Sequence, residues 1–318
     1  MTNFTMVRGF LLMGFSSTRE LQVLHAMLFL LIYLVALMGN LLIFTLISLD
    51  GHLNTPMYFF LKNLSFLDLC LISTTVPKSI ANSLSCSHSI SFLGCVLQVF
   101  LVILCIGSEL FLLTAMSYDR YVAICQPLHY EVIMNKGNCL RMAAASWITG
   151  GFFGALHSAN TFSLPFCGSN EIHQFFCDVS SLLRISCSET HIAIDVTVAI
   201  GIILGIFCCI SIGISYGHIF STVLKIPTTE GQSKAFSTCL PHLIVLLVFI
   251  ATGFMDFLKP PSDSSSVLEM LLPIFYIVVP PTLNPVIYSL RNKDIKISVK
   301  KLMSWKYFSE GLIPKSFL

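Results

Sequence analysis

Long apolar stretches alternate with short polar segments along most of the chain. A helix of roughly 20 apolar residues crosses the hydrocarbon layer of a membrane, because each residue adds about 1.5 Å and the helix satisfies its own backbone hydrogen bonds. The pattern predicts an all-α fold, a seven-transmembrane helix bundle that forms one domain over residues 1–318. The predicted spans are Val23–Leu49, Met57–Val76, Phe92–Met116, Met142–Phe162, Val196–Phe220, Phe236–Phe257 and Val267–Tyr288.

Basic residues are distributed unevenly on the two sides of these spans. The N-terminal segment (1–22) and the even-numbered loops hold five of the 18 Lys and Arg residues, and the odd-numbered loops and the tail (289–318) hold twelve. Since Lys and Arg remain on the cytoplasmic side, this bias predicts an extracellular N-terminus and a cytoplasmic tail. The sequon at Asn3 then lies where glycosylation occurs. Mixed basic and apolar residues after Tyr288 predict a short amphipathic helix on the membrane surface.

The composition supports a membrane protein and excludes several other classes. Of the 318 residues, 55% are hydrophobic and 11% charged, against about 25% charged in a soluble domain, and the net charge is +2. That charge does not indicate nucleic-acid binding. The stretch GISYG (Gly213–Gly217) matches the G-x-S-x-G pattern of serine hydrolases, which requires a strand-turn-helix context, but it lies inside a predicted span. We therefore predict no enzymatic activity, cofactor or structural metal.

Four cysteines fall on the predicted outer side. Cys95 begins the third span, and Cys167, Cys177 and Cys187 follow in the long second outer loop. Disulfides persist in that oxidising compartment. Four cysteines allow three pairings, and Cys86 nearby adds a further possibility. We favour Cys95–Cys177, which would hold the loop across the mouth of the bundle, with Cys167–Cys187 closing a smaller loop.

Polar residues inside the spans form a second set of candidates. Asp68 and Glu109 are the clearest, and Asn40 and Asn284 could join them through water. Ionisable residues inside a membrane usually face the bundle interior and have a function. The four residues predict either a polar network that binds a cation such as sodium near Asp68 and Glu109, or hydrogen bonds that only hold the helices together. The sequence leaves both interpretations open.

The segment MSYDRYVAICQPLHY (Met116–Tyr130) places an acid beside a base at the end of the third span. Asp119 could hold Arg120 while the bundle is closed and release it when the inner helix ends separate. Alternatively, Arg120 simply extends its charged end to the membrane surface, as Arg commonly does at helix ends.

This segment resembles a signature of the vertebrate olfactory receptors, a branch of the rhodopsin-like G-protein-coupled receptors, and of their terrestrial-vertebrate class in particular. Further motifs are similar to those of the family and follow its order along the chain. They are Gly39-Asn40, LNTPMYFFLKNLSFLDLC (Leu53–Cys70), HQFFCD (His173–Asp178), Ser215-Tyr216, KAFSTCLPHL (Lys234–Leu243) and PTLNPVIYSLRN (Pro281–Asn292). Three positions differ from the family pattern: Ser117 replaces Ala, Pro241 replaces Ser, and Ile250 replaces a Tyr that many relatives carry.

The resemblance implies that small, mainly apolar volatile odorants bind in the outer half of the bundle. The implied pocket residues are Val102, Ile103, Ile106, Ile200, Leu204, Ile250, Gly253, Phe254, Phe257, Ile274 and Ile277. It also implies a switch that opens for a heterotrimeric G protein of the stimulatory, olfactory type and raises cyclic AMP. The implied switch and coupling residues are Asp119, Arg120, Tyr121, Tyr216, Lys234, His242, Asn284, Pro285 and Tyr288.

Two other functions are compatible with a membrane bundle of this kind. One is a rhodopsin-like receptor for a non-odorant metabolite or lipid. The other is a transporter, but transporters commonly show repeated halves with matched broken helices, and the spans show no such symmetry. The resemblance favours an odorant receptor of the plasma membrane whose partners are odorants, a G protein and membrane lipid.

Overall fold

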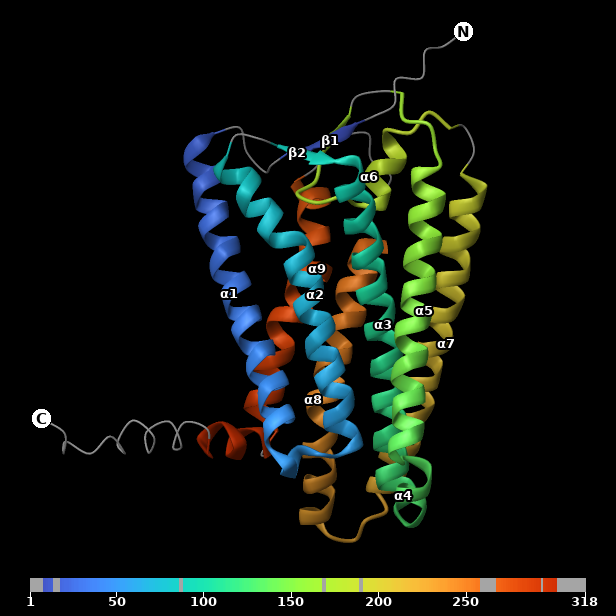
Figure 1. Cartoon of the computed structure of the whole chain (residues 1–318). Helices are drawn as coiled ribbons and strands as arrows, with labels where there is room; N and C mark the ends of the chain where they lie inside the picture. Colours follow the sequence, from blue (N-terminus) through green and yellow to red (C-terminus); the bar gives the residue numbers. More distant parts are fainter. Residues whose placement is uncertain are drawn as a thin grey trace, which may run out of the picture.

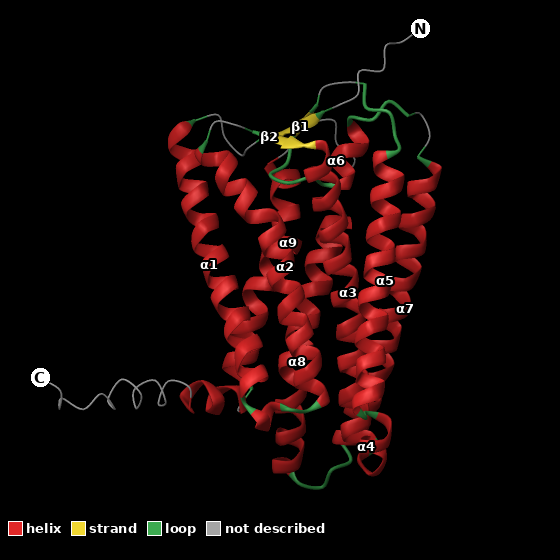
Figure 2. Cartoon of the chain, in the orientation of Figure 1, coloured by secondary structure: helices red, strands yellow, loops and turns green. Residues whose placement is uncertain are grey.

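Seven long helices form one bundle in the computed structural model of the chain (Figures 1 and 2). The structure describes residues 8–13, 18–85, 88–167, 170–188, 191–257, 267–292 and 294–301. The long helices are α1 (Arg19–Leu49), α2 (Pro56–Leu84), α3 (Phe92–Cys125), α5 (Lys136–Phe162), α7 (Ile192–Val223), α8 (Thr229–Phe257) and α9 (Val267–Arg291). The short helices are α4 (Tyr130–Ile133) and α6 (Val179–Arg184), with 3₁₀ turns at Gly51–Leu53 and Pro127–His129.

Each predicted span lies inside one of these helices, and the helices continue past the apolar stretches. Five of them, α1, α2, α3, α7 and α8, are both long enough and apolar enough to cross a membrane. In α9, the apolar part found among the described residues is shorter, Ile274–Ser289. The 27-residue α5 is long enough but less apolar, because it carries several glycines and polar residues.

Helix α5 lies directly against α3, and two glycines make this approach possible. A Cβ atom at Gly150 would lie 2.6 Å from the backbone oxygen of Leu104, and one at Gly154 would lie 2.8 Å from that of Phe100. Both distances are shorter than real Cβ contacts, so a larger residue would force the helices apart. Glycines spaced four apart commonly serve such close packing in membranes.

A small three-stranded sheet covers one end of the bundle, which we call the sheet end (Figure 2). Strand β1 (Gly9–Leu12) lies between β2 (Ser89–Ser91), which is antiparallel to it, and β3 (Glu171–Ile172), which is parallel. The ring of Phe10 is buried against three other rings, those of Phe92, Phe162 and Phe166. Backbone hydrogen bonds and aromatic packing thus fasten the start of the described chain to the bundle.

Helix α4 and the helical segment 294–301 lie at the opposite end, which we call the α4 end (Figure 1). The segment is amphipathic, with Ile295 buried and the side chains at 296 and 297 exposed. The hydroxyl of Ser298 donates to the Asp50 carboxylate at 2.6 Å, and this bond is the main cause of a lowered pKa of Asp50. Tyr58 donates to Asp294 at 2.8 Å. These contacts fix the segment against α1 and α2 at the α4 end of the bundle.

The substitution Gly150→Ala should destabilise the protein, by about 1–3 kcal/mol, because the added methyl group overlaps the α3 backbone. Alanine is otherwise the better helix former, by about 1 kcal/mol. The matched control is Gly213→Ala in α7, where a Cβ meets no described atom within 4 Å. Thermal inactivation and surface expression measure the effect. Equal stability of the two variants would contradict the close packing of α3 and α5.

Candidate functional site

A cavity of about 240 Å³ lies near the sheet end, between α3, α8, α9 and the loop that carries Cys177. Most of its wall is apolar, so it suits a small molecule with a mainly apolar body. The residues that line it are Val99, Val102, Ile103 and Ile106 from α3, Phe176, Cys177, Asp178 and Val179 from the loop and α6, Phe249, Thr252 and Gly253 from α8, and Tyr276 from α9.

Four of the predicted pocket residues line this cavity: Val102, Ile103, Ile106 and Gly253. The three α3 residues share one face of the helix. Ile106 follows Val102 by four positions and Ile103 by three, and residues at these spacings lie on the same side of a helix. Their position could therefore be read from periodicity once α3 was known to face the ligand.

The other predicted pocket residues lie elsewhere or outside the described side chains. On α7, Ile200 is 42% exposed on the outer surface, and Leu204 also does not line the cavity. Ile250 packs against the main core beside Phe249, and Ile274 and Ile277 pack there from α9. The side chains of Phe254 and Phe257 lie outside the described residues. Of the two α7 residues, Ile200 is exposed and Leu204 is partly buried on the same helix face as Thr197 and Cys208.

The cavity also contains three polar side chains that the sequence analysis did not assign to it: Asp178, Thr252 and Tyr276. The hydroxyl of Tyr276 donates to Asp178 at 3.4 Å, and that of Ser180 donates to the other carboxylate oxygen of Asp178. Thr252 donates to backbone oxygens of its own helix. These groups already have partners, so the cavity remains mainly apolar with a polar edge. The adjacency of Asp178 to Cys177 was the signal that could have placed it here.

Two disulfides hold the loop that covers the cavity. The structure pairs Cys95 with Cys177 and Cys167 with Cys187, the pairing favoured from the sequence, and Cys86 lies outside the described residues. The Cys95–Cys177 bond joins the start of α3 to a loop residue 82 positions later. It therefore brings Phe176 and Asp178 over the α3 face that lines the cavity.

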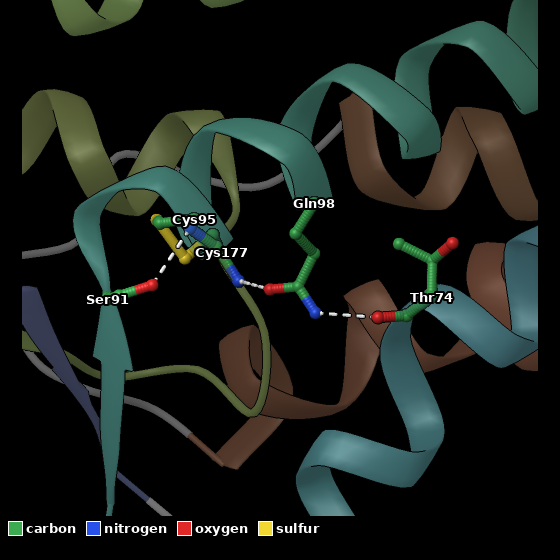
Figure 3. The surroundings of a disulfide bond; sticks show 6 residues. Thr74, Ser91, Cys95, Gln98 and Cys177 are labelled. Atoms are coloured by element: carbon green, nitrogen blue, oxygen red, sulfur yellow. Dashed lines mark hydrogen bonds between the residues drawn. A yellow bond between two sulfur atoms is a disulfide. The ribbon is translucent and has the colours of Figure 1, made fainter.

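Gln98 adds a second attachment beside this disulfide (Figure 3). Its side-chain oxygen accepts the backbone N–H of Cys177 at 2.8 Å, and its side-chain nitrogen donates to the backbone oxygen of Thr74 at 3.0 Å. One buried amide thus connects α3 to both the loop and α2. Its amide donor and acceptor are both used, as buried polar groups require.

The predicted polar network lies in the middle of the bundle. Asn284 donates to both oxygens of Asp68, at 3.3 and 3.0 Å, and joins α9 to α2. Asn40 donates to the backbone oxygen of Pro281 at 2.8 Å and joins α1 to α9. Glu109 is buried, and one of its carboxylate oxygens has no hydrogen-bond partner among the described residues. The structure thus brings Asn40, Asp68 and Asn284 into contacts between helices.

The predicted switch residues gather toward the α4 end. Arg120 donates from Nε to the Asp119 carboxylate at 2.9 Å and also forms an ion pair with it. Tyr130 of α4 donates to the other oxygen of Asp119 at 2.8 Å. Asp119 therefore binds both Arg120 and α4. This favours the interpretation that Asp119 holds Arg120 over the one in which Arg120 only extends to the membrane surface.

A second contact in this region joins three helices through one buried histidine. The Nε2 atom of His242 lies 3.1 Å from the backbone oxygen of Leu113. Because a carbonyl only accepts, Nε2 carries the proton, and Nδ1 accepts from the hydroxyl of Tyr216 at 2.6 Å. Helix α8 is thereby tied to α3 and α7.

The remaining predicted switch residues differ in exposure. Tyr288 is buried and its hydroxyl has no partner among the described residues. Tyr121 is partly buried, and Lys234 is exposed. Pro285 packs against Gly39, where an added Cβ would lie 2.8 Å from the proline ring. Tyr288 therefore has a hydroxyl available for a new bond, and Lys234 is available to a partner.

The sequence profile described as "Olfactory receptor" matches residues 29–306 of this chain. The chain belongs to the olfactory receptor family. Human olfactory receptor 14A2 is 60% identical to it over 98% of this chain and 99% of its own length. Human olfactory receptor 14A16 is 58% identical over 96% and 99%, and human olfactory receptor 14K1 is 55% identical over 99% and 100%.

Family membership confirms the resemblance that the sequence motifs carried. This olfactory receptor is a multi-pass plasma-membrane protein with the seven-helix fold of its family, and its function is odorant reception with G-protein coupling. The relatives are receptors, so neither the hydrolase interpretation of GISYG nor the transporter interpretation holds.

Gln98→Leu should lower the stability of this olfactory receptor, because it leaves the buried N–H of Cys177 without its acceptor. An unsatisfied buried group costs roughly 1–3 kcal/mol. Gln98→Glu keeps an acceptor and should lose less. The control is Gln126→Leu at the other end of α3, where the side chain donates to the Tyr121 hydroxyl in an exposed position. Thermal inactivation of the purified receptor gives the ranking. A change no larger than that of the control would mean that Gln98 does not help to hold the loop.

Proposed function

We propose that the cavity near the sheet end is the odorant site and that it accepts small molecules with a mainly apolar body and at most one polar group. The observation that carries the proposal is the convergence of α3, α8, α9 and the disulfide-held loop on one apolar space. Burial contributes about 25 cal/mol per Å² of apolar surface, so a ligand of about ten heavy atoms gains limited free energy and binds in the micromolar range or more weakly.

The polar edge formed by Asp178, Thr252 and Tyr276 limits which polar group the cavity tolerates. The hydroxyls of Thr252 and Tyr276 already donate, to backbone oxygens and to Asp178 respectively. A ligand that displaces neither bond must place its polar group at this edge and its apolar part against α3. Because the edge then offers only acceptor oxygens, this argues for alcohols or hydrocarbons over strongly charged ligands.

The route from cavity to G protein runs along α3 and α8. Helix α8 lines the cavity through Phe249, Thr252 and Gly253, and two turns further along it carries His242. A ligand that favours a shifted α8 would break the bonds of His242 to Leu113 and Tyr216. Arg120 could then leave Asp119 and meet Tyr216 and Tyr288. Such a switch requires only that the ligand bind the open state more tightly.

The charge distribution supports an orientation with the sheet end outside the cell and the α4 end in the cytoplasm. In this orientation Asn3 is glycosylated, and the exposed Lys234 and the segment 294–301 face the partner and the anionic inner leaflet. The partner we propose is a stimulatory G protein of the olfactory type, which raises cyclic AMP.

The carboxylates of Asp68 and Glu109 fit a sodium ion in the closed state. Both are buried, Asn284 is the hydrogen-bond donor to Asp68, and neither carboxylate forms an ion pair with a described basic side chain. Sodium prefers oxygen ligands, which these residues supply. Bound there, the ion would neutralise charge that is costly inside a membrane.

Gly253→Leu should reduce odorant potency by tenfold or more, because the new side chain occupies part of the cavity. A Cβ there meets no described atom within 4 Å, so the variant should fold. The control is Gly201→Leu in α7, which is equally open but does not line the cavity. Cells that express the receptor, the G protein and a cyclic-AMP reporter are titrated with a panel of odorants. Unchanged potency across every active odorant would place the site elsewhere.

Tyr130→Phe should raise ligand-free signalling by roughly two- to tenfold, because it removes one of the bonds that hold Asp119, each contributing about 0.5–1.5 kcal/mol. Tyr33→Phe is the control, since its hydroxyl contacts Ser73 far from the switch.

Arg120→Ala should abolish the response while surface expression persists. A receptor that still signals normally with Arg120→Ala would reject the switch.

A further inference from the structure

A second cavity, of about 430 Å³, lies between α3, α5 and α7, on the α4 side of the odorant cavity. It shares no residue with that cavity. The residues that line it are Phe111, Thr114, Ala115, Ser117 and Tyr118 from α3, Met142, Ala145, Ser146 and Thr149 from α5, and Ser211 and Ser215 from α7. None of the roles described above uses this space.

Hydroxyl groups dominate the polar chemistry of this wall. Seven of its eleven residues are Ser, Thr or Tyr. Ser146 donates to the backbone oxygen of Met142 at 2.9 Å, and Ser211 to that of Phe207 at 2.8 Å. Thr114, Ser117 and Ser215 likewise donate to their own helices. Each of these hydroxyl protons is used, so what the oxygens can still offer an occupant is acceptor lone pairs.

The serine of the GISYG stretch lies in this wall, and its surroundings explain why the motif is not catalytic. The hydroxyl of Ser215 donates to Ser211 at 2.9 Å and sits within an uninterrupted helix. No His, Asp or Glu is among the lining residues, so no general base is available to activate it. The wall is suited to binding.

The cavity opens sideways, toward the lipid. Its rim includes Tyr118, which is 38% exposed, and Ala145. The apolar side chains beside the rim, Ile148 on α5 and Ile214 on α7, are 71% and 58% exposed. In a membrane these side chains contact lipid tails, so the cavity is reached from the hydrocarbon layer rather than from water.

The lipid-facing opening of the cavity and the hydroxyl oxygens of its wall determine which kind of molecule it can bind. Acyl chains reach this depth but carry no hydrogen-bond donor, while the charged headgroups of phospholipids remain at the surface. A mostly apolar wall that offers a few acceptor oxygens is matched by an uncharged lipid with one hydroxyl donor. A rigid body also loses less conformational entropy on binding than a flexible chain.

We propose that this cavity binds one membrane sterol, with its hydroxyl donating to the Ser and Thr oxygens of the wall and its ring system covering Phe111 and Met142. The occupant contacts α3, α5 and α7 at once. It lies one residue from Asp119 on α3 and one residue from Tyr216 on α7, because Tyr118 and Ser215 line the wall. Sterol therefore braces these two helices beside the switch.

The test uses a photoreactive sterol added to cell membranes that contain the full-length receptor. Labelled receptor is digested, and the labelled peptides are identified by mass spectrometry. We expect label on peptides of α3, α5 and α7, at least fivefold less label in Ala145→Phe, which fills the cavity, and no loss in Ile148→Phe, which adds the same ring to the lipid-facing side of the same helix. Equal labelling of the two variants overturns the proposal.

Competition in the unaltered receptor tests the donor and does not depend on any variant folding. Unlabelled sterol should displace the label at least tenfold more effectively than its methyl ether, which has the same rings but no donor. Equal competition by the two, or displacement by phospholipid alone, overturns the proposal. The assay needs no odorant, so its outcome is separate from that of the odorant site.

Discussion

The close contact between α3 and α5 is the constraint from which the arrangement of the sites follows. With no side chain at Gly150 and Gly154, the α3 backbone can lie against α5. In lipid there is little hydrophobic gain from bringing two apolar helices together, so close packing and satisfied polar groups must hold the bundle. Helix α3, fixed in this way, presents one face to the cavity near the sheet end and another to α7, and toward the α4 end it carries Asp119, which accepts a hydrogen bond from Tyr130 of α4.

The same helix therefore carries both the proposed recognition surface and the proposed switch. Val102, Ile103 and Ile106 line the cavity near the sheet end, and four to five turns further along, Asp119 holds Arg120 and Tyr130. In the proposed switch, the helix that moves is a less constrained neighbour of α3. Helix α8 is hydrogen-bonded to α3 where His242 meets the backbone oxygen of Leu113, and this bond has to break for α8 to shift.

The sequence predicted the helices well because their signal is local. A run of 20 apolar residues has one stable form in lipid, so each predicted span lies in a helix. The pairing of Cys95 with Cys177 also followed from compartment and position. The rotation of a helix about its own axis depends on its neighbours in the fold, not on the local sequence. Ile200 was therefore assigned to the pocket although its side chain is exposed on the surface of the bundle. Gln98 was missed because its two partners, Cys177 and Thr74, become neighbours only after folding.

The sheet at the sheet end could not be predicted from the sequence either, since β1, β2 and β3 are each four residues or fewer and pair across long separations. Its topology has a consequence for biogenesis. Strand β1 is synthesised before any transmembrane helix, yet β3, with which it pairs, emerges some 160 residues later, after α5. Strand β1 can pair with β2 once α2 has been made, but the sheet is complete only after more than half of the polypeptide has been translated, so its closure marks a late stage of maturation.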